Sequence, residues 1–196
     1  KSPDTVIAFG GPSVPDRVEP FLNEQTFIDL ACHGEGEKTA LAILENLDSK
    51  NWDRISGVSF LQENGTLVSN PKSPRMGDLN EFPSPYVEGV FDPLMKAHPS
   101  ERWLGAWETN RGCPFSCAYC DWGSAVNAKV YSFDLDRLYK EMEWFAQNKV
   151  EYIYCCDANF GMLPRDTEIA HFVAATKKKY GYPNAMSVQG TKNATE

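Results

Sequence analysis

The sequence lacks several features that would place the protein in a special class. No apolar run approaches the roughly 18 residues that a membrane-spanning helix needs, and we expect no secretory signal peptide from the first residues given. Basic residues are outnumbered, because 19 Lys and Arg against 27 Asp and Glu give a net charge of −8. A nucleic-acid surface normally carries a basic patch. We therefore expect a cytoplasmic protein with neither a membrane nor a nucleic acid as its partner.

Disulfides are also not expected, although the chain has six cysteines. Nothing in the sequence indicates secretion, so the cysteines are predicted to be ligands or core residues. The balance of 42% hydrophobic and 23% charged residues is that of a folded chain. Residue 1 is Lys rather than Met, and a strand-like run at 185–188 precedes only a short polar tail. We expect an internal piece of a larger protein.

The first part of the chain alternates short apolar runs with helical patterns. Strands are expected at 5–9 and 27–32, and a helix after Gly34 would place Leu41, Leu44 and Leu47 on one face. Strand and helix in alternation with short loops predict a parallel α/β sheet. Apolar runs at 58–61 and 66–69 flank Asn64-Gly65, a strong hairpin signal.

Prolines divide the chain. Six of the thirteen lie between residues 70 and 100, a density that disfavours regular elements and indicates a linker. We therefore expect a first domain over 1–69, a linker over 70–100 and a second domain over 101–196. In the second domain, strands at 103–109, 151–156 and 185–188 alternate with helices at 134–148 and 166–180. Repeated β-α units predict the start of a TIM-type barrel, whose chemistry lies at the C-terminal ends of its strands.

Three cysteines at one such strand end are the strongest functional signal. Cys113, Cys117 and Cys120 form a Cys-x3-Cys-x2-Cys loop. Three thiolates on a compact loop would bind three irons of a [4Fe–4S] cluster and leave the fourth open, as a catalytic metal needs. Two other readings stay open. Zinc favours paired Cys-x2-Cys arms, and an electron-carrying cluster needs a fourth thiolate, which Cys155 or Cys156 would supply. Cys32, Cys155 and Cys156 are otherwise expected to be small buried hydrophobes.

The cysteine loop, with Tyr119 before its last cysteine, resembles the radical S-adenosylmethionine (SAM) superfamily. This resemblance implies that the open iron binds SAM and that reduction cleaves SAM to a 5′-deoxyadenosyl radical. It places Tyr119 near the adenine. Where many members carry Gly-Gly-Glu, this chain has Asp157 and Asn159, which would hold the SAM amino group. The alternative for Asp157 is that it merely caps the following turn.

The first part of the chain resembles the cobalamin-binding subgroup of that superfamily. The strand that ends in Gly10-Gly11 is similar to the last portion of a Rossmann-like B12-binding domain, and the segment from Asp29 to Thr39 matches its Gly-Glu-Gly-Glu helix start. The resemblance implies a cobalamin site at Gly10, Gly11, Gly34 and Glu35.

The resemblance implies a cobalamin-dependent radical SAM methyltransferase that acts on an unactivated carbon of a small molecule or peptide. A flavodoxin or ferredoxin would supply electrons. The alternatives are a radical SAM cyclase, a rearrangement enzyme, a methylthiotransferase-like enzyme, or a non-catalytic iron–sulfur binding module. The sequence assigns no catalytic residue beyond the cofactor ligands.

Overall fold

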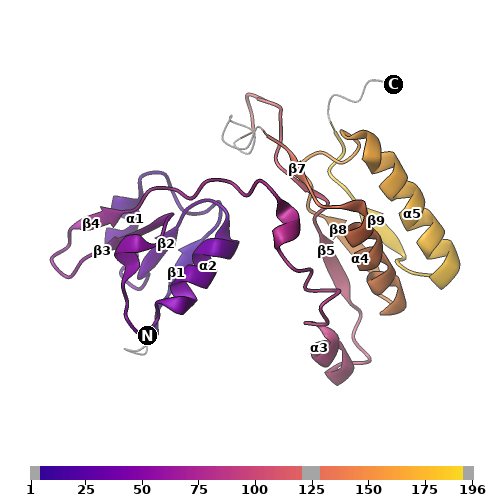
Figure 1. Cartoon of the computed structure of the whole chain (residues 1–196), viewed down its shortest axis with the longest axis horizontal. Coiled ribbons are helices and arrows are strands. Elements are labelled where there is room, and N and C mark those ends of the chain that lie inside the picture. The colour runs from indigo at the N-terminus through magenta and orange to yellow at the C-terminus, as the bar shows by residue number, and fades with distance from the viewer. Residues whose placement is uncertain (1–4, 121–128, 192–196) are drawn as a thin grey trace. The chain divides into compact units, whose positions relative to one another are not determined.

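The computed structural model describes residues 5–120 and 129–191, and the chain divides into two compact units, Lys1–Met76 and Gly77–Glu196 (Figure 1). Each unit has its own small sheet with helices packed on it. No helix within the described ranges is both long and apolar enough to cross a membrane.

The sheet of the first unit is mixed rather than wholly parallel. Its strands follow the order β1-β2-β3-β4. Only β1 and β2 run parallel, with Gly10 opposite Cys32, while β3 and β4 form the hairpin predicted from Asn64-Gly65. Because parallel strands end at one edge, the loops after Gly10 and Cys32 leave the sheet together. The bounds are β1 (Ala8–Gly10), β2 (Leu30–Cys32), β3 (Val58–Leu61), β4 (Leu67–Ser69), α1 (Val18–Glu24), α2 (Gly36–Glu45) and η1 (Trp52–Arg54).

Helix α2 packs on the sheet through a face that does not carry its leucines. Its buried residues are Thr39 and Ile43, four positions apart, and Ile43 joins a core cluster with Leu30 and Val58. Leu41 and Leu44 are instead 56% and 63% exposed. The predicted helix is confirmed, and its leucine face is the exposed one. The helix carries two apolar stripes, and periodicity alone does not decide which of them meets the sheet.

The proline-rich segment is more ordered than a linker. It contains η2 (Leu79–Glu81) and α3 (Asp92–Ala97), and Pro93 is tolerated because it lies in the first turn of α3. The ring of Tyr86 lies 4.5 Å from that of Phe145 and 5.3 Å from that of Trp144, centroid to centroid. Its hydroxyl donates a hydrogen bond to the carbonyl of Ala106. From Gly77 onward, this segment therefore belongs to the second unit.

The second unit has the parallel β-α pattern that we predicted. Strands β5 (Leu104–Trp107), β8 (Tyr152–Cys155) and β9 (Ala185–Ser187) pair in that order, all parallel. Helices α4 (Leu135–Gln147) and α5 (Pro164–Tyr180) pack against each other beside the sheet (Figure 1). A short antiparallel pair, β6 (Asn110–Arg111) and β7 (Tyr131–Ser132), lies on either side of the cysteine segment in sequence and was not predicted.

The core of this unit forms between β5 and α4. Phe145 of α4 is fully buried over Gly105 of β5, where an added Cβ would lie only 2.9 Å from its ring. Trp107 donates from its indole nitrogen to the buried carboxylate of Glu141 at 2.8 Å, and Glu141 also pairs with Arg137 at 2.9 Å. Because both polar groups are satisfied, the indole can be buried at the end of β5.

The close approach at Gly57 gives a test of the first unit. Gly57 has a φ of 76°, and a Cβ there would lie 2.8 Å from the carbonyl oxygen of His33. We expect Gly57→Ala to lower the free energy of unfolding by about 2–4 kcal/mol, because left-handed strain and overpacking add. Gly65→Ala is the matched control, since its φ is 80° but no atom lies within 4 Å of the added Cβ. For this variant we expect the free energy of unfolding, measured by urea denaturation, to fall by about 1 kcal/mol. If the two variants lost the same free energy of unfolding, the close approach to the His33 carbonyl would not be what requires glycine at position 57.

Candidate functional site

The three loop cysteines lie around one hollow at the C-terminal ends of the barrel strands. The hollow has a volume of about 210 Å³. Its walls come from the loops that follow β5, β8 and β9, which is where a β/α barrel carries its chemistry. The lining residues are Cys113, Phe115, Cys117, Cys120, Cys156, Asp157, Ala158, Asn159 and Gln189.

The thiols of this loop are free to act as ligands. All six cysteines of the chain are unpaired, and Cys113 is the most buried of the three in the loop. The backbone amide of Cys120 donates to the carbonyl of Cys117 at 3.0 Å, which closes a turn between the last two. Gly112 precedes Cys113 with a φ of 124°, a conformation that favours glycine. The local sequence therefore bends the chain so that all three side chains reach one hollow.

This donor set fits an iron–sulfur cluster. Thiolates are the usual cluster ligands, and each of the three would bind a different iron. In the part of the chain that the structure describes, no three His, Cys, Asp or Glu side chains converge as ligands of a single ion. Cluster ligands stand further apart than the ligands of one ion, because the cube lies between them. The shared hollow and the chemistry of the thiols are therefore consistent with the cluster.

Asp157 joins the end of β8 to the segment that leads into the cysteine loop. Its carboxylate is 1% exposed. One oxygen accepts from the backbone amides of Thr109 at 2.7 Å and Asn110 at 3.1 Å; the other accepts from the Asn110 side-chain amide at 2.8 Å and from the Thr109 hydroxyl. Burial raises the pKa of this carboxyl group, and the hydrogen bonds from Thr109 and Asn110 oppose that rise.

These contacts occupy both oxygens of Asp157, whose expected role in binding SAM stays a prediction. Asn159, the second residue expected to bind SAM, is 2% exposed and donates from its Nδ2 to Sγ of Cys113 at 3.0 Å. Sequence reasoning placed both residues at this strand end but missed what they contact. Tyr119 is 78% exposed and is not among the residues that line the hollow.

The neighbouring cysteines 155 and 156 have opposite surroundings. Cys155 is fully buried, and burial followed by the nearby carboxylate of Asp157 raises the pKa of its thiol. Cys156 is exposed and lines the hollow with the loop cysteines. The expectation of a small buried hydrophobe was therefore right for Cys155 and wrong for Cys156. Successive residues at a strand end point to opposite sides, so only one of them can face the core.

In the first unit, the glycines expected to meet cobalamin lie at one edge of the sheet. Gly11 and Gly34 are exposed with φ values of 89° and 84°, and no atom lies within 4 Å of a Cβ added to either. The carboxylate of Glu35 accepts from the backbone amide of Met76 at 2.7 Å and pairs with Arg75 at 3.5 Å. The glycines leave backbone open to a flat ligand, while Glu35 is engaged within its own unit.

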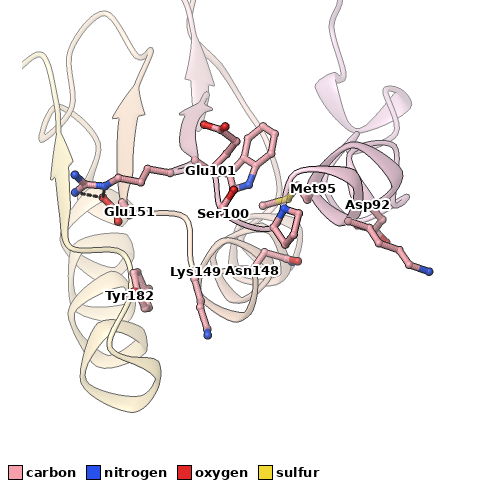
Figure 2. A pocket seen from close by; sticks show the side chains of 12 residues that line it. Asp92, Met95, Ser100, Glu101, Asn148, Lys149, Glu151 and Tyr182 are labelled. Carbon is pink, nitrogen blue, oxygen red and sulfur yellow. Dashed lines mark hydrogen bonds and ion pairs between the residues drawn. The ribbon is translucent and has the colours of Figure 1, made fainter.

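A larger hollow, of about 560 Å³, lies at the other end of the second sheet (Figure 2). Its lining residues Arg102, Glu151 and Tyr182 each lie just before a strand. The Arg102 guanidinium donates to Glu151 at 2.7 and 2.5 Å, an exposed pair of small energetic weight. The N-terminal end of barrel strands serves stability rather than chemistry, so we place the functional site at the cysteine hollow.

Comparison with known proteins agrees with this geometry. No family model matches the chain. Over 99% of its length the chain is 39% identical to the cobalamin-dependent radical SAM methyltransferase TokK of Streptomyces tokunonensis. Over 100% of its length it is 40% identical to the 2-(S-pantetheinyl)-carbapenam-3-carboxylate methyltransferase of Streptantibioticus cattleyicolor. The chain spans 29% of the length of each relative.

Solved structures share the fold. One is the cobalamin-dependent SAM radical enzyme OxsB with aqua-cobalamin and SAM bound, at a TM-score of 0.60 and 21% identity over 89% of this chain and 24% of that one. Another is the radical SAM methyltransferase TsrM from Kitasatospora setae with cobalamin and a [4Fe–4S] cluster bound. Its TM-score is 0.60, and the identity is 18% over 92% of this chain and 36% of that one. The predicted fold class, the end of a B12-binding domain joined to the start of a radical SAM barrel, is confirmed.

The two relatives, together with the fold, thus identify the chain as part of a protein of the radical SAM class that also has a Rossmann-like unit. More particularly, the chain corresponds to a segment of the cobalamin-binding radical SAM enzymes, and its curated relatives are methyltransferases.

Replacing the Asp157 carboxylate tests whether it organises the cysteine loop. We expect Asp157→Asn to lower the free energy of unfolding by about 2–4 kcal/mol. Whichever oxygen the amide nitrogen replaces, it would face a donor of Asn110, the backbone amide at one position or the side-chain amide at the other. The amount of iron that each chain incorporates during anaerobic reconstitution should also be lower in this variant than in the wild type. Both quantities can be measured on one preparation, by urea denaturation and iron analysis.

Asp166→Asn is the matched control. Asp166 is equally buried, but its hydrogen bonds from Gly161 at 2.8 Å and Leu163 at 2.9 Å both reach one oxygen, which an asparagine keeps. This variant should retain iron at the wild-type level. If Asp157→Asn retained as much iron as Asp166→Asn, the anchoring role of Asp157 would be refuted.

Proposed function

We propose that the protein containing this chain is a cobalamin-dependent radical SAM methyltransferase. The observation that carries the proposal is the convergence of Cys113, Cys117 and Cys120 on one hollow at the C-terminal ends of the barrel strands. The similarity to two methyltransferases over the whole chain supports the reaction class. We place the protein in the cytoplasm.

The residues of the second unit would hold and shield the iron–sulfur cofactor. The cluster and SAM together would supply a 5′-deoxyadenosyl radical. The three loop thiolates would bind iron, while Asp157 keeps the segment before them on the end of β8. Half-buried Phe115 contributes an apolar wall, which limits the access of water to the site. Asp157, Asn159 and Tyr119 remain the residues we propose for SAM; the amide oxygen of Asn159 is not used in its contact with Cys113.

The glycine edge of the first unit would hold the second cofactor. Cobalamin supplies a methyl group for transfer. Gly10 ends β1 and Gly11 follows it, while Gly34 and Glu35 come shortly after β2, so the parallel pairing brings these two segments to one edge of the sheet. Backbone without side chains permits close approach of a flat ligand. The methyl acceptor would be an unactivated carbon of a small molecule or peptide, and a flavodoxin or ferredoxin would supply the electrons.

One observation favours a second candidate, an electron-transferring iron–sulfur module. Cys156 lines the same hollow as the loop cysteines, where a fourth thiolate would close the open iron. The two candidates differ in whether the cluster needs Cys156.

Cysteine substitutions separate these candidates. Anaerobically reconstituted protein should hold about one [4Fe–4S] cluster per chain, and Cys113→Ala, Cys117→Ala or Cys120→Ala should each abolish it. Cys155→Ala and Cys156→Ala are the controls and should retain the cluster. Iron analysis and electron paramagnetic resonance of the reduced protein provide the readout. Loss of the cluster in Cys156→Ala would favour the electron-transfer module, and stoichiometric zinc without iron would overturn both candidates.

Product analysis tests methyl transfer. Turnover should yield S-adenosylhomocysteine from the SAM that supplies the methyl group, and 5′-deoxyadenosine from the SAM cleaved at the cluster. Gly11→Val should bind at least tenfold less cobalamin and form less of the methylated product, because the side chain occupies space that the ligand needs and strains a φ of 89°. Its iron–sulfur spectrum should match the wild type. Turnover without cobalamin and without S-adenosylhomocysteine would exclude the methyltransferase assignment.

A further inference from the structure

A side-chain amide contacts one sulfur of the cysteine loop. Nδ2 of Asn159 lies 3.0 Å from Sγ of Cys113, and both side chains are buried. A thiolate that binds iron has no proton to donate, so it can only accept. The amide must therefore present its NH₂ group, rather than its oxygen, to this sulfur. The contact is an N–H···S hydrogen bond to a cluster ligand.

The backbone on both sides of Asn159 is fixed. Two residues earlier, Asp157 is held by Thr109 and Asn110. One residue later, the amide of Phe160 donates to the carbonyl of Gln189 at 2.8 Å, and the carbonyl of Phe160 accepts from Thr191 at 3.0 Å. The amide of Asn159 is thus pre-positioned between two anchored points, and little reorganisation is needed when the charge on the sulfur changes.

A donor at this position acts on the two redox states unequally. Reduction adds an electron to the cluster and increases the negative charge on its sulfurs. A hydrogen bond donated to one of them therefore stabilises the reduced state more than the oxidised state, which raises the reduction potential. The effect is strengthened here because the contact is buried and poorly screened by water.

We propose that Asn159 tunes the reduction potential of the cluster through its hydrogen bond to the Cys113 thiolate. The proposal rests on the cluster site proposed above. Asn159 is a positioning residue in this role, since it acts through the sulfur of a ligand. It sets how strong an electron donor must be to reduce the cluster by one electron.

The test is an anaerobic potentiometric titration of the reconstituted protein without SAM, followed by electron paramagnetic resonance of the reduced cluster. Asn159→Leu keeps the approximate shape of the side chain and removes the donor. At the wild-type midpoint potential, we expect its ratio of reduced to oxidised cluster to be about tenfold lower, equal to a downward shift of about 59 mV for one electron. Asn159→Asp should shift the midpoint further down, because a carboxylate repels the charge on the sulfur.

Gln189→Leu is the matched control, because Gln189 is a second amide that lines the same hollow, whereas it is Asn159 that donates to Sγ of Cys113. This variant should leave the midpoint unchanged. An unchanged or raised midpoint in Asn159→Leu would overturn the proposal. Loss of the cluster in both Asn159 variants would also overturn it, by showing that the amide retains the cluster rather than tunes it. Absence of a cluster in the wild type would instead refute the proposed function.

Discussion

The second unit depends on one buried carboxylate. Asp157 receives hydrogen bonds from the backbone and side chains of Thr109 and Asn110, and so ties the end of β8 to the chain that leaves β5. Burying a charge is costly unless donors surround it, and here four donors do so. This contact sets the direction in which the cysteine loop begins. It also sets the position of Asn159, two residues after Asp157.

Much of this architecture could be predicted from the sequence because its signals are local. Helix α4 shows its apolar residues at spacings of three and four, the hairpin is marked by Asn64-Gly65, and the spacing of Cys113, Cys117 and Cys120 indicates the kind of metal centre. The parallel order of β5, β8 and β9 follows from alternation of strands with helices. Each of these inferences needs only residues that are neighbours along the chain.

What the sequence did not reveal depends on contacts between distant segments. The sequence pattern of α2 is as compatible with burial of Leu41 and Leu44 as with burial of Thr39 and Ile43. Packing on the sheet decides which of these faces is buried. The proline-rich segment looks unstructured until Tyr86 is seen against Phe145, 59 positions later. Likewise, Asp157 and Asn159 could be named as polar residues at the right strand end, but their partners lie 46 to 48 positions away.

The alternation along residues 155–159 has a consequence for engineering. Cys155, Asp157 and Asn159 are buried, whereas Cys156 is exposed and Ala158 only partly covered, and both of these line the hollow. Residue parity therefore separates the buried side chains from the more exposed ones, although Asp157 and Asn159 also line the hollow. A combinatorial library that randomises 156 and 158 alone would diversify the wall of the hollow while leaving in place the side chains of Asp157 and Asn159 that hold the cysteine segment.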